Sequence, residues 1–406
     1  MTRMVDDFRR FVAQTSDDPI SLHVVRALGS RLWDSDGRIY LDLIAGIGVA
    51  SVGHSNTRVV DAIQDQIRRH LHVMVYGEYV QDAQVELARR LASVLPTPLS
   101  SIYFTSSGAE AIEGSLKLAR KWTGRTGFAS FEGGYHGDTM GALSLMAGDT
   151  YRRPFEPVVP GARYLPWNDE WGLAAIDETV AAVVIEPVQG EGGVRIPDAG
   201  FLPALRRRCD EVGALLVFDE VITAFGRTGR LFGCQHWDVV PDVLVMAKAL
   251  GGGMPLGAFA ARPEIMATLR RDPPLAHVTT FGGHPVSCAA GLAALEYTLN
   301  EDLSARAARL GESWRERLKV TMAGPWLMDI RGLGLLIGIE FDTPERTRAF
   351  VDGCRTRGLL LGWTLHRDTV VRLAPPLVIQ EEDLEIAAMI MGEIAGGKVG
   401  GARFGD

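Results

Sequence analysis

The chain has 406 residues, of which 47% are hydrophobic and 23% are charged, and it contains 46 glycines. This length and composition are typical of a folded protein with a large core and many tight turns, and they exclude a largely disordered chain. The formal net charge of −8 excludes nucleic-acid binding through a broadly basic surface, because neutralising phosphates requires clustered Lys and Arg.

The N-terminal hundred residues predict a small unit that begins the fold. Residues 1–19 contain no apolar signal core, and no apolar run in the chain reaches the roughly 18 residues that span a bilayer. "SRLWDSDGRIYLDL", residues 30–43, predicts a β-hairpin. We therefore expect a soluble, cytoplasmic protein whose N-terminal segment belongs to a mixed α+β unit.

From about residue 100 to 285, short apolar runs alternate with amphipathic runs of helix length. Because the apolar runs are hydrophobic on both faces, this alternation predicts a parallel sheet covered by helices on both sides. The expected strands lie at 101–105, 126–131, 181–187, 214–220 and 242–248, and the expected helices at 109–122 and 200–213.

The chain beyond about residue 300 again predicts a smaller α+β unit. "DIRGLGLLIGIEF", residues 329–341, is typical of a strand, and the glycine-rich end at 395–406 has so little apolar surface that we expect it to fray. The prediction is an α/β fold: residues 51–298 form a large domain with a mostly parallel central sheet, and residues 1–50 and 299–406 together form a smaller α+β domain.

The four cysteines are far apart and match neither a disulfide framework nor the spacing of zinc ligands. They are Cys209, Cys234, Cys288 and Cys354. We expect reduced thiols and no metal site.

Ligands of open parallel sheets bind beyond the carboxyl ends of the strands, so the residues that follow each strand are candidates for a site. "SSGAEAIEG", residues 106–114, predicts a helix whose free N–H groups could hold a phosphate, although this stretch alone favours an ordinary Ser/Thr helix cap. On the next loop, Tyr135 and His136 are flanked by glycines. Tyr135 could stack on a flat cofactor or simply pack against the protein.

Two charged side chains end neighbouring strands. Asp219 ends the run 214–220 and Lys248 ends the run 242–248, so both should face one crevice. A helix cap or a salt bridge would also explain Asp219. With an aromatic ring and a phosphate-binding turn nearby, however, the pair matches pyridoxal phosphate (PLP): Lys248 would form the Schiff base, and Asp219 would hold the proton of the ring nitrogen.

Eight motifs resemble, in the same order, those of the class III, fold-type-I PLP-dependent aminotransferases, which include acetylornithine, ornithine, 4-aminobutyrate and diaminopelargonate aminotransferases. They are "AGIGVASVGH", "SSGAEAIEGSLKLAR", "GGYHGDTMG", "IEPVQGEGG", "FDEVITAFGRTG", "MAKALGGGMPLGA", "TTFGGHP" and "VVRLAPPL". The resemblance covers nearly the whole chain. It implies a homodimer that moves an amino group from an amine or amino acid, with ω-amino groups among the candidates, to a 2-oxo acid by a ping-pong cycle.

The resemblance also implies how this chain would hold PLP. Gly108 and Ala109 would donate backbone N–H groups to the phosphate, and Thr280 would add a hydroxyl from the partner subunit. Val221 would pack on the ring face opposite Tyr135.

The same resemblance implies that His136 is a further cofactor contact and that Asp219 meets the ring nitrogen. Lys248 would also carry the proton to and from the substrate carbon.

Glu191 and Arg372 match a pair that, in several members, forms a salt bridge which opens to admit the carboxylate of a 2-oxo acid; a permanent structural ion pair is the alternative. Two departures bear on the substrate. Asp138 stands where acetylornithine, ornithine and 4-aminobutyrate members have an Arg that grips a carboxylate, which disfavours those three assignments. Ile222 replaces a common Gln and indicates an apolar pocket wall.

Other activities remain open on the same cofactor. An epimerase, aminomutase or decarboxylase would use the same residues, because pocket geometry decides which substrate bond breaks. A non-catalytic protein that keeps the fold is disfavoured by the presence of both Asp219 and Lys248. The need for a stoichiometric amino acceptor distinguishes a transaminase from the other enzymes.

Overall fold

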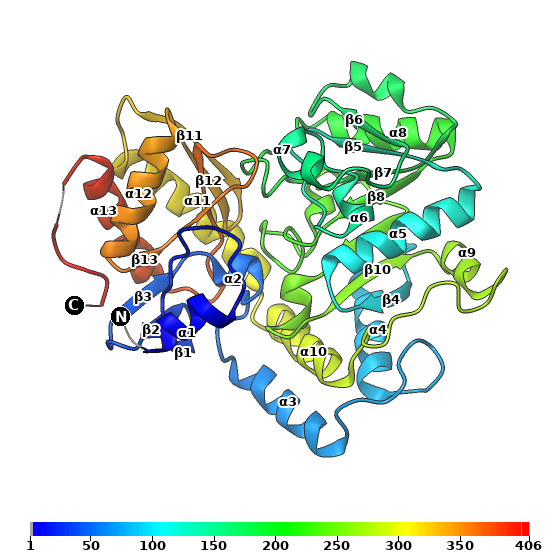
Figure 1. The fold of residues 1–406 in the computed structure, drawn as a ribbon, viewed down its shortest axis with the longest axis horizontal. Coiled ribbons are helices and arrows are strands. Elements are labelled where there is room, and N and C mark those ends of the chain that lie inside the picture. The colour runs from blue at the N-terminus through cyan, green and yellow to red at the C-terminus, as the bar shows by residue number, and fades with distance from the viewer. Residues whose placement is uncertain (1–2, 399, 406) are drawn as a thin grey trace.

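The structure, a computed structural model, describes residues 3–398 and 400–405 and has two lobes (Figure 1). One lobe is built around a seven-stranded sheet, and the other contains two four-stranded sheets formed by the two ends of the chain. Within the described ranges, no helix is both long and apolar enough to cross a membrane.

The seven-stranded sheet confirms the prediction of a mostly parallel sheet. All neighbouring pairs from β9 to β6 run parallel, whereas β10 runs antiparallel to both β4 and β9. The sequence analysis did not predict β10. In sheet order the strands are β4 (Ser101–Thr105), β10 (Gly257–Ala261), β9 (Val243–Met246), β8 (Leu215–Asp219), β7 (Val180–Ile185), β5 (Gly127–Phe131) and β6 (Ala162–Leu165).

Apolar side chains on alternate positions of the strands pack against helices on both faces of the sheet. In β8, Val217 belongs to the core that lies under α5 (Gly108–Thr123), and Phe218 belongs to the core shared with α4 (Asp82–Val94) and α8 (Phe201–Val212). Because both faces are covered, the carboxyl edge of the sheet is where polar side chains of these strands reach a cavity.

The smaller lobe joins the two chain ends through a parallel pair, β3 (Ile39–Asp42) and β13 (Leu359–Leu360). The predicted hairpin at 30–43 is confirmed, since β2 (Arg31–Asp34) pairs antiparallel with β3. β1 (Val24–Leu28) pairs with the other edge of β2.

The stretch 329–341 forms two strands rather than the single strand expected. β11 (Leu327–Leu333) and β12 (Leu336–Phe341) pair antiparallel and are joined by a turn at Gly334, whose φ of +54° is left-handed. β15 (Val370–Leu373) pairs with β12, and β14 (Gly362–Trp363) pairs with β15.

Helices of the smaller lobe and of the junction complete the fold. They are α1 (Arg3–Phe11), α2 (Ala45–Gly48), α3 (Thr57–Arg69), α10 (Pro285–Asn300), α11 (Leu303–Thr321), α12 (Pro344–Thr356) and α13 (Glu381–Ala395), and the short helices of the large lobe are α6 (Met140–Leu143), α7 (Asp149–Arg152) and α9 (Pro263–Met266).

The prediction that the glycine-rich tail frays is wrong for residues 400–405. Phe404 is only 5% exposed and belongs to the core of the smaller lobe. Its backbone N–H donates to the Arg357 carbonyl at 2.9 Å, and the Arg357 guanidinium donates to the Gly400 carbonyl at 2.9 Å. One buried aromatic ring thus supplies the apolar contact that the average composition of the tail does not reveal.

Candidate active site

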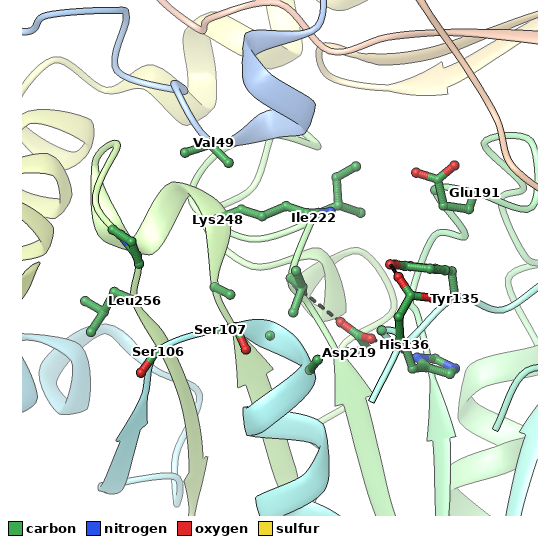
Figure 2. A pocket seen from close by; sticks show the side chains of 18 of the residues that line it. Val49, Ser106, Ser107, Tyr135, His136, Glu191, Asp219, Ile222, Lys248 and Leu256 are labelled. Atoms are coloured by element: carbon green, nitrogen blue, oxygen red, sulfur yellow. Dashed lines mark hydrogen bonds and ion pairs between the residues drawn. The ribbon is translucent and has the colours of Figure 1, made fainter. Parts of the chain in front are cut away.

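A cavity of about 700 Å³ opens at the carboxyl edge of the seven-stranded sheet (Figure 2). Segments from both lobes line it, including Val49 after α2 and Arg372 in β15. All the site residues predicted above line this cavity except Thr280. The sequence therefore located side chains from widely separated segments that the fold brings together.

The N-terminus of α5 forms one end of the cavity. Ser107 caps the helix by accepting from the Glu110 backbone N–H at 3.2 Å, so the predicted Ser cap is confirmed. Gly108 and Ala109 lie in the first turn, where backbone N–H groups have no intrahelical acceptor. A side chain at Gly108 would place its Cβ 2.9 Å from Val221, so this close approach requires glycine.

Asp219 and His136 form a buried pair at the floor of the cavity. Asp219 Oδ2 lies 2.8 Å from His136 Nδ1, and Asp219 Oδ1 accepts from the Val221 backbone N–H at 3.1 Å. Burial disfavours the charged imidazole, but the hydrogen bond and charge of Asp219, helped by Glu186, outweigh it and raise the pKa of His136. The carboxylate thus keeps lone pairs for one further donor while a histidine holds its orientation.

Tyr135 presents its ring to the cavity from the loop after β5. Its hydroxyl donates to Asp138 Oδ2 at 2.8 Å, and its backbone N–H donates to Glu186 Oε1 at 3.0 Å. Burial, with the hydrogen bond to Asp138, raises the pKa of the Tyr135 phenol, so it stays neutral. Tyr135 is therefore held both at its hydroxyl and at its backbone N–H.

Lys248 follows β9 and extends its side chain into the cavity (Figure 2). Its φ of +48° is left-handed, a conformation that costs energy for a residue with a Cβ and is characteristic of functional sites. Within the described chain the amine makes no hydrogen bond or ion pair. Removal from water, followed by the positive charge of Arg372, lowers the pKa of Lys248, which favours the neutral, nucleophilic amine.

Glu191 and Arg372 form a direct ion pair at the side of the cavity. Arg372 is 4% exposed, and Glu191 also accepts from the Leu365 backbone N–H at 2.9 Å. The structure brings together the two residues that the sequence paired across 181 positions. Among the described residues, Glu191 is the one carboxylate that pairs with this buried Arg, and a ligand carboxylate could take its place.

Apolar side chains form the remaining walls, as the replacement at position 222 indicated. Ile222, Val221 and Val49 line the cavity. Thr280 is exposed and lies outside the cavity of its own chain.

The sequence analysis missed Glu186 as a site residue. It follows β7, is 5% exposed and lines the cavity. The rule that located Asp219 and Lys248 would also have located Glu186, because its motif, "IEPVQGEGG", begins at the end of an apolar strand.

A comparison with protein families now decides the identity of the fold. The family described as "Aminotransferase class-III" matches residues 12–394. The chain belongs to the class III aminotransferases. This family depends on pyridoxal phosphate, and the chain is accordingly a PLP-dependent transaminase of fold type I. Of the activities left open by the sequence, transamination is the one this membership favours.

Individual relatives agree with this assignment. The chain is similar to the acetylornithine aminotransferase of Methanopyrus kandleri, with 44% identity over 370 residues that cover 91% of this chain and 92% of the relative. It is also similar to the putrescine aminotransferase of Pectobacterium atrosepticum, with 41% identity over 372 residues that cover 88% of this chain and 79% of the relative.

A solved structure of the Toxoplasma gondii ornithine aminotransferase, described with PLP at its active site, matches the fold. The TM-score is 0.89 at 32% identity, and the match covers 97% of this chain and 93% of that one. The cavity of this transaminase fits the same cofactor: it offers a free amine at Lys248, a buried carboxylate at Asp219 and unpaired N–H groups at the start of α5.

The pairing of His136 with Asp219 predicts a pH-dependent contribution to stability. Since the pKa of His136 is raised in the fold, its contribution is complete below pH 6.5 and is lost as the pH rises through the higher folded value. We expect the free energy of unfolding of the wild type, measured in urea without added cofactor, to fall by up to about 1.4 kcal/mol per pH unit in that window. His136→Gln should abolish this fall.

His236→Gln is the matched control. Burial lowers the pKa of His236, so wild-type His236 contributes a gain in stability as the pH rises from its lower folded value to 6.5, and its removal should change the slope below pH 6.5 only. If the free energy of unfolding of His136→Gln depends on pH in the same way as that of the wild type, Asp219 does not raise the pKa of His136.

Proposed function

We propose that this transaminase takes its amino group from an amine whose far end is cationic or uncharged, such as a diamine, and transfers it to a 2-oxo acid. The observation that carries the proposal is Asp138, an exposed carboxylate at the mouth of the cavity beside the Tyr135 hydroxyl. A carboxylate at this place attracts a distal ammonium and repels a distal carboxylate. The name of the Pectobacterium relative agrees with a diamine donor, whereas the acetylornithine name does not.

The acceptor would bind where Glu191 now contacts Arg372. A 2-oxo acid carries a carboxylate that can replace the Glu191 carboxylate on the guanidinium, whereas an amine donor needs the pair closed. The hydrogen bond from Leu365 gives Glu191 a second partner that it would leave on opening. One site could thus serve both substrates of a ping-pong cycle.

The roles of the other site residues follow from their positions in the cavity. PLP, when bound, supplies the electron sink that makes the α-proton of the substrate acidic. We infer that Gly108 and Ala109 bind its phosphate, that Tyr135 and Val221 enclose its ring, and that Asp219, held by His136, keeps a proton on the ring nitrogen. The Lys248 amine carries the cofactor covalently and, when released, moves the proton at the substrate carbon.

We also infer a homodimer with a shared site. Exposed apolar side chains gather where the chain between α3 and α4 meets residues 275–281: Val80 is 89% exposed, Leu275 58% and Phe281 56%. The Phe281 ring lies 5.0 Å from the His72 ring, which places these segments on one surface. Exposed apolar side chains that gather on one surface often mark a protein–protein interface. Thr280 lies on the same surface, from which it could reach the cavity of a partner.

A cytoplasmic location completes the proposal. Its support is that all four cysteines are buried and unpaired, as in proteins of reducing compartments.

The donor proposal predicts an order of substrates. In rapid-mixing experiments with the PLP-loaded enzyme, putrescine should convert the bound cofactor to its amine form at least about tenfold faster than N-acetylornithine or 4-aminobutyrate. Asp138→Asn should slow putrescine about two- to fivefold, the effect of one exposed charge pair, and leave butylamine unchanged as the matched donor without a distal charge. N-Acetylornithine as the fastest donor would contradict the proposal.

Lys248→Ala should abolish turnover and the absorption band of covalently held cofactor. The fold should persist, because the side chain makes no hydrogen bond or ion pair within the described part of the chain. Activity is measured with the best donor and 2-oxoglutarate, and folding by circular dichroism. Near-wild-type turnover in this variant would rule out Lys248 as the catalytic amine.

The dimer proposal predicts that Phe281→Glu gives a monomer that loses PLP, measured by light scattering and by cofactor content after dialysis. Val320→Glu, which changes another exposed apolar residue on α11, should stay dimeric. Thr280→Ala should stay dimeric but retain PLP less well. A dimeric Phe281→Glu with full cofactor content would overturn the proposed interface.

A further inference from the structure

Glu186 is the one buried carboxylate of the cavity, among the described residues, that has no role in the scheme above. We propose that Glu186 is a positioning residue. It holds the loop that carries Tyr135 and the loop that carries Glu191 at a fixed position relative to each other. This inference rests on the proposed roles of Tyr135 and Glu191, and it deepens the proposed function.

The two oxygens of Glu186 are divided between the two loops. Oε1 accepts from the Tyr135 backbone N–H at 3.0 Å, and Oε2 accepts from the Gly190 backbone N–H at 2.9 Å. Gly190 immediately precedes Glu191. Hydrogen bonds to an ionised, buried acceptor are among the strongest in proteins, so one side chain sets the position of both loops relative to the end of β7.

Only a carboxylate can make both contacts. A glutamine has one acceptor oxygen, and its NH₂ group would face one of the two N–H groups as a second donor. A buried N–H that loses its acceptor carries the full cost of desolvation. The backbone N–H groups of both loops therefore have an acceptor when Glu186 is ionised. No neutral side chain of the same size can accept from both.

The surroundings leave little freedom for the loop of Glu191. A Cβ at Gly190 would lie 3.3 Å from Ile222 Cγ2 and 3.5 Å from Glu186 Oε2, so the backbone approaches both closely. Gln189 forms a second link at the base of the loops, where its side-chain amide donates to the Glu132 carbonyl at 2.9 Å. Glu186, in contrast, contacts Tyr135 and Gly190, which line the cavity.

The charged groups that face Glu186 are His136, Asp219 and Lys248. Burial raises the pKa of Glu186 to about 7; the charge of His136 opposes this rise, and that of Asp219 adds to it. The ionised form that binds both loops is thus complete only on the alkaline side of neutrality. Protonation adds an O–H donor to one oxygen and weakens its contact with a backbone N–H.

The test is hydrogen–deuterium exchange on the full-length, PLP-loaded enzyme at pH 8, followed by peptides that contain Tyr135 and Gly190. Glu186→Gln should speed exchange at both amides by at least about tenfold, because local opening becomes easier. Glu191→Gln should speed exchange in the Gly190 peptide only. Unchanged protection of either amide in Glu186→Gln would overturn the proposal.

Glu220→Gln is the matched control for removing a buried carboxylate. Glu220 is fully buried outside the cavity and accepts from the backbone N–H groups of Gly233 and Cys234. Its replacement should loosen that loop and leave the Tyr135 and Gly190 peptides protected. Should Glu186→Gln fail to fold, Glu186→Asp, which keeps the charge but shortens the reach, carries the same test.

Kinetics provide a second readout. Glu186→Gln should lower kcat/KM about tenfold for the amine donor and for the 2-oxo acid alike, because it displaces both the Tyr135 ring and the Glu191 carboxylate. A lower melting temperature with both values unchanged would show a merely structural role and overturn the proposal. The exchange result does not depend on which amine is the donor, so a failure of the donor proposal and a failure of this one remain distinguishable.

Discussion

The position of Asp219 at the carboxyl end of β8 is the constraint on which the site depends. A carboxylate that is 3% exposed and follows four buried strand residues must find donors, and it finds them in His136 and in the Val221 backbone. Both donors come from loops at the same edge of the sheet. The need to satisfy one buried charge therefore draws the cofactor-facing loops toward each other.

The same principle extends across the cavity. The carboxylates of Asp219, Glu186 and Glu191 share the cavity with the basic groups of His136, Lys248 and Arg372, and each carboxylate accepts from at least one backbone N–H. Lys248 is the exception, because its amine makes no ion pair within the described residues. Burial and then the charge of Arg372 lower the pKa of Lys248, which favours the neutral form of the amine.

The smaller lobe contributes a site residue that the large sheet does not carry. Asp219 and Lys248 belong to the large lobe, whereas Arg372 lies on β15 of the smaller lobe and contacts Glu191 across the cavity. The ion pair of Arg372 with Glu191 thus connects the two lobes at the cavity. The chain ends meet in that lobe because β3 and β13 pair with each other, and so Val49 and Arg372 border the same cavity.

The sequence by itself determined five of the seven strands of the large sheet and placed Asp219 and Lys248 at strand ends. A strand that is buried on both faces has a continuous run of apolar residues, and a charged residue at the end of such a run is conspicuous. The pairing of Glu191 with Arg372 came only from resemblance. The tertiary structure alone decided the antiparallel β10, the two strands in 329–341, the buried Phe404 and the two contacts of Glu186. The pairing of β10 with β4, the burial of Phe404 and the contact of Glu186 with Tyr135 depend on partners far away in the chain, and no local pattern of hydrophobic and polar residues records such a partner.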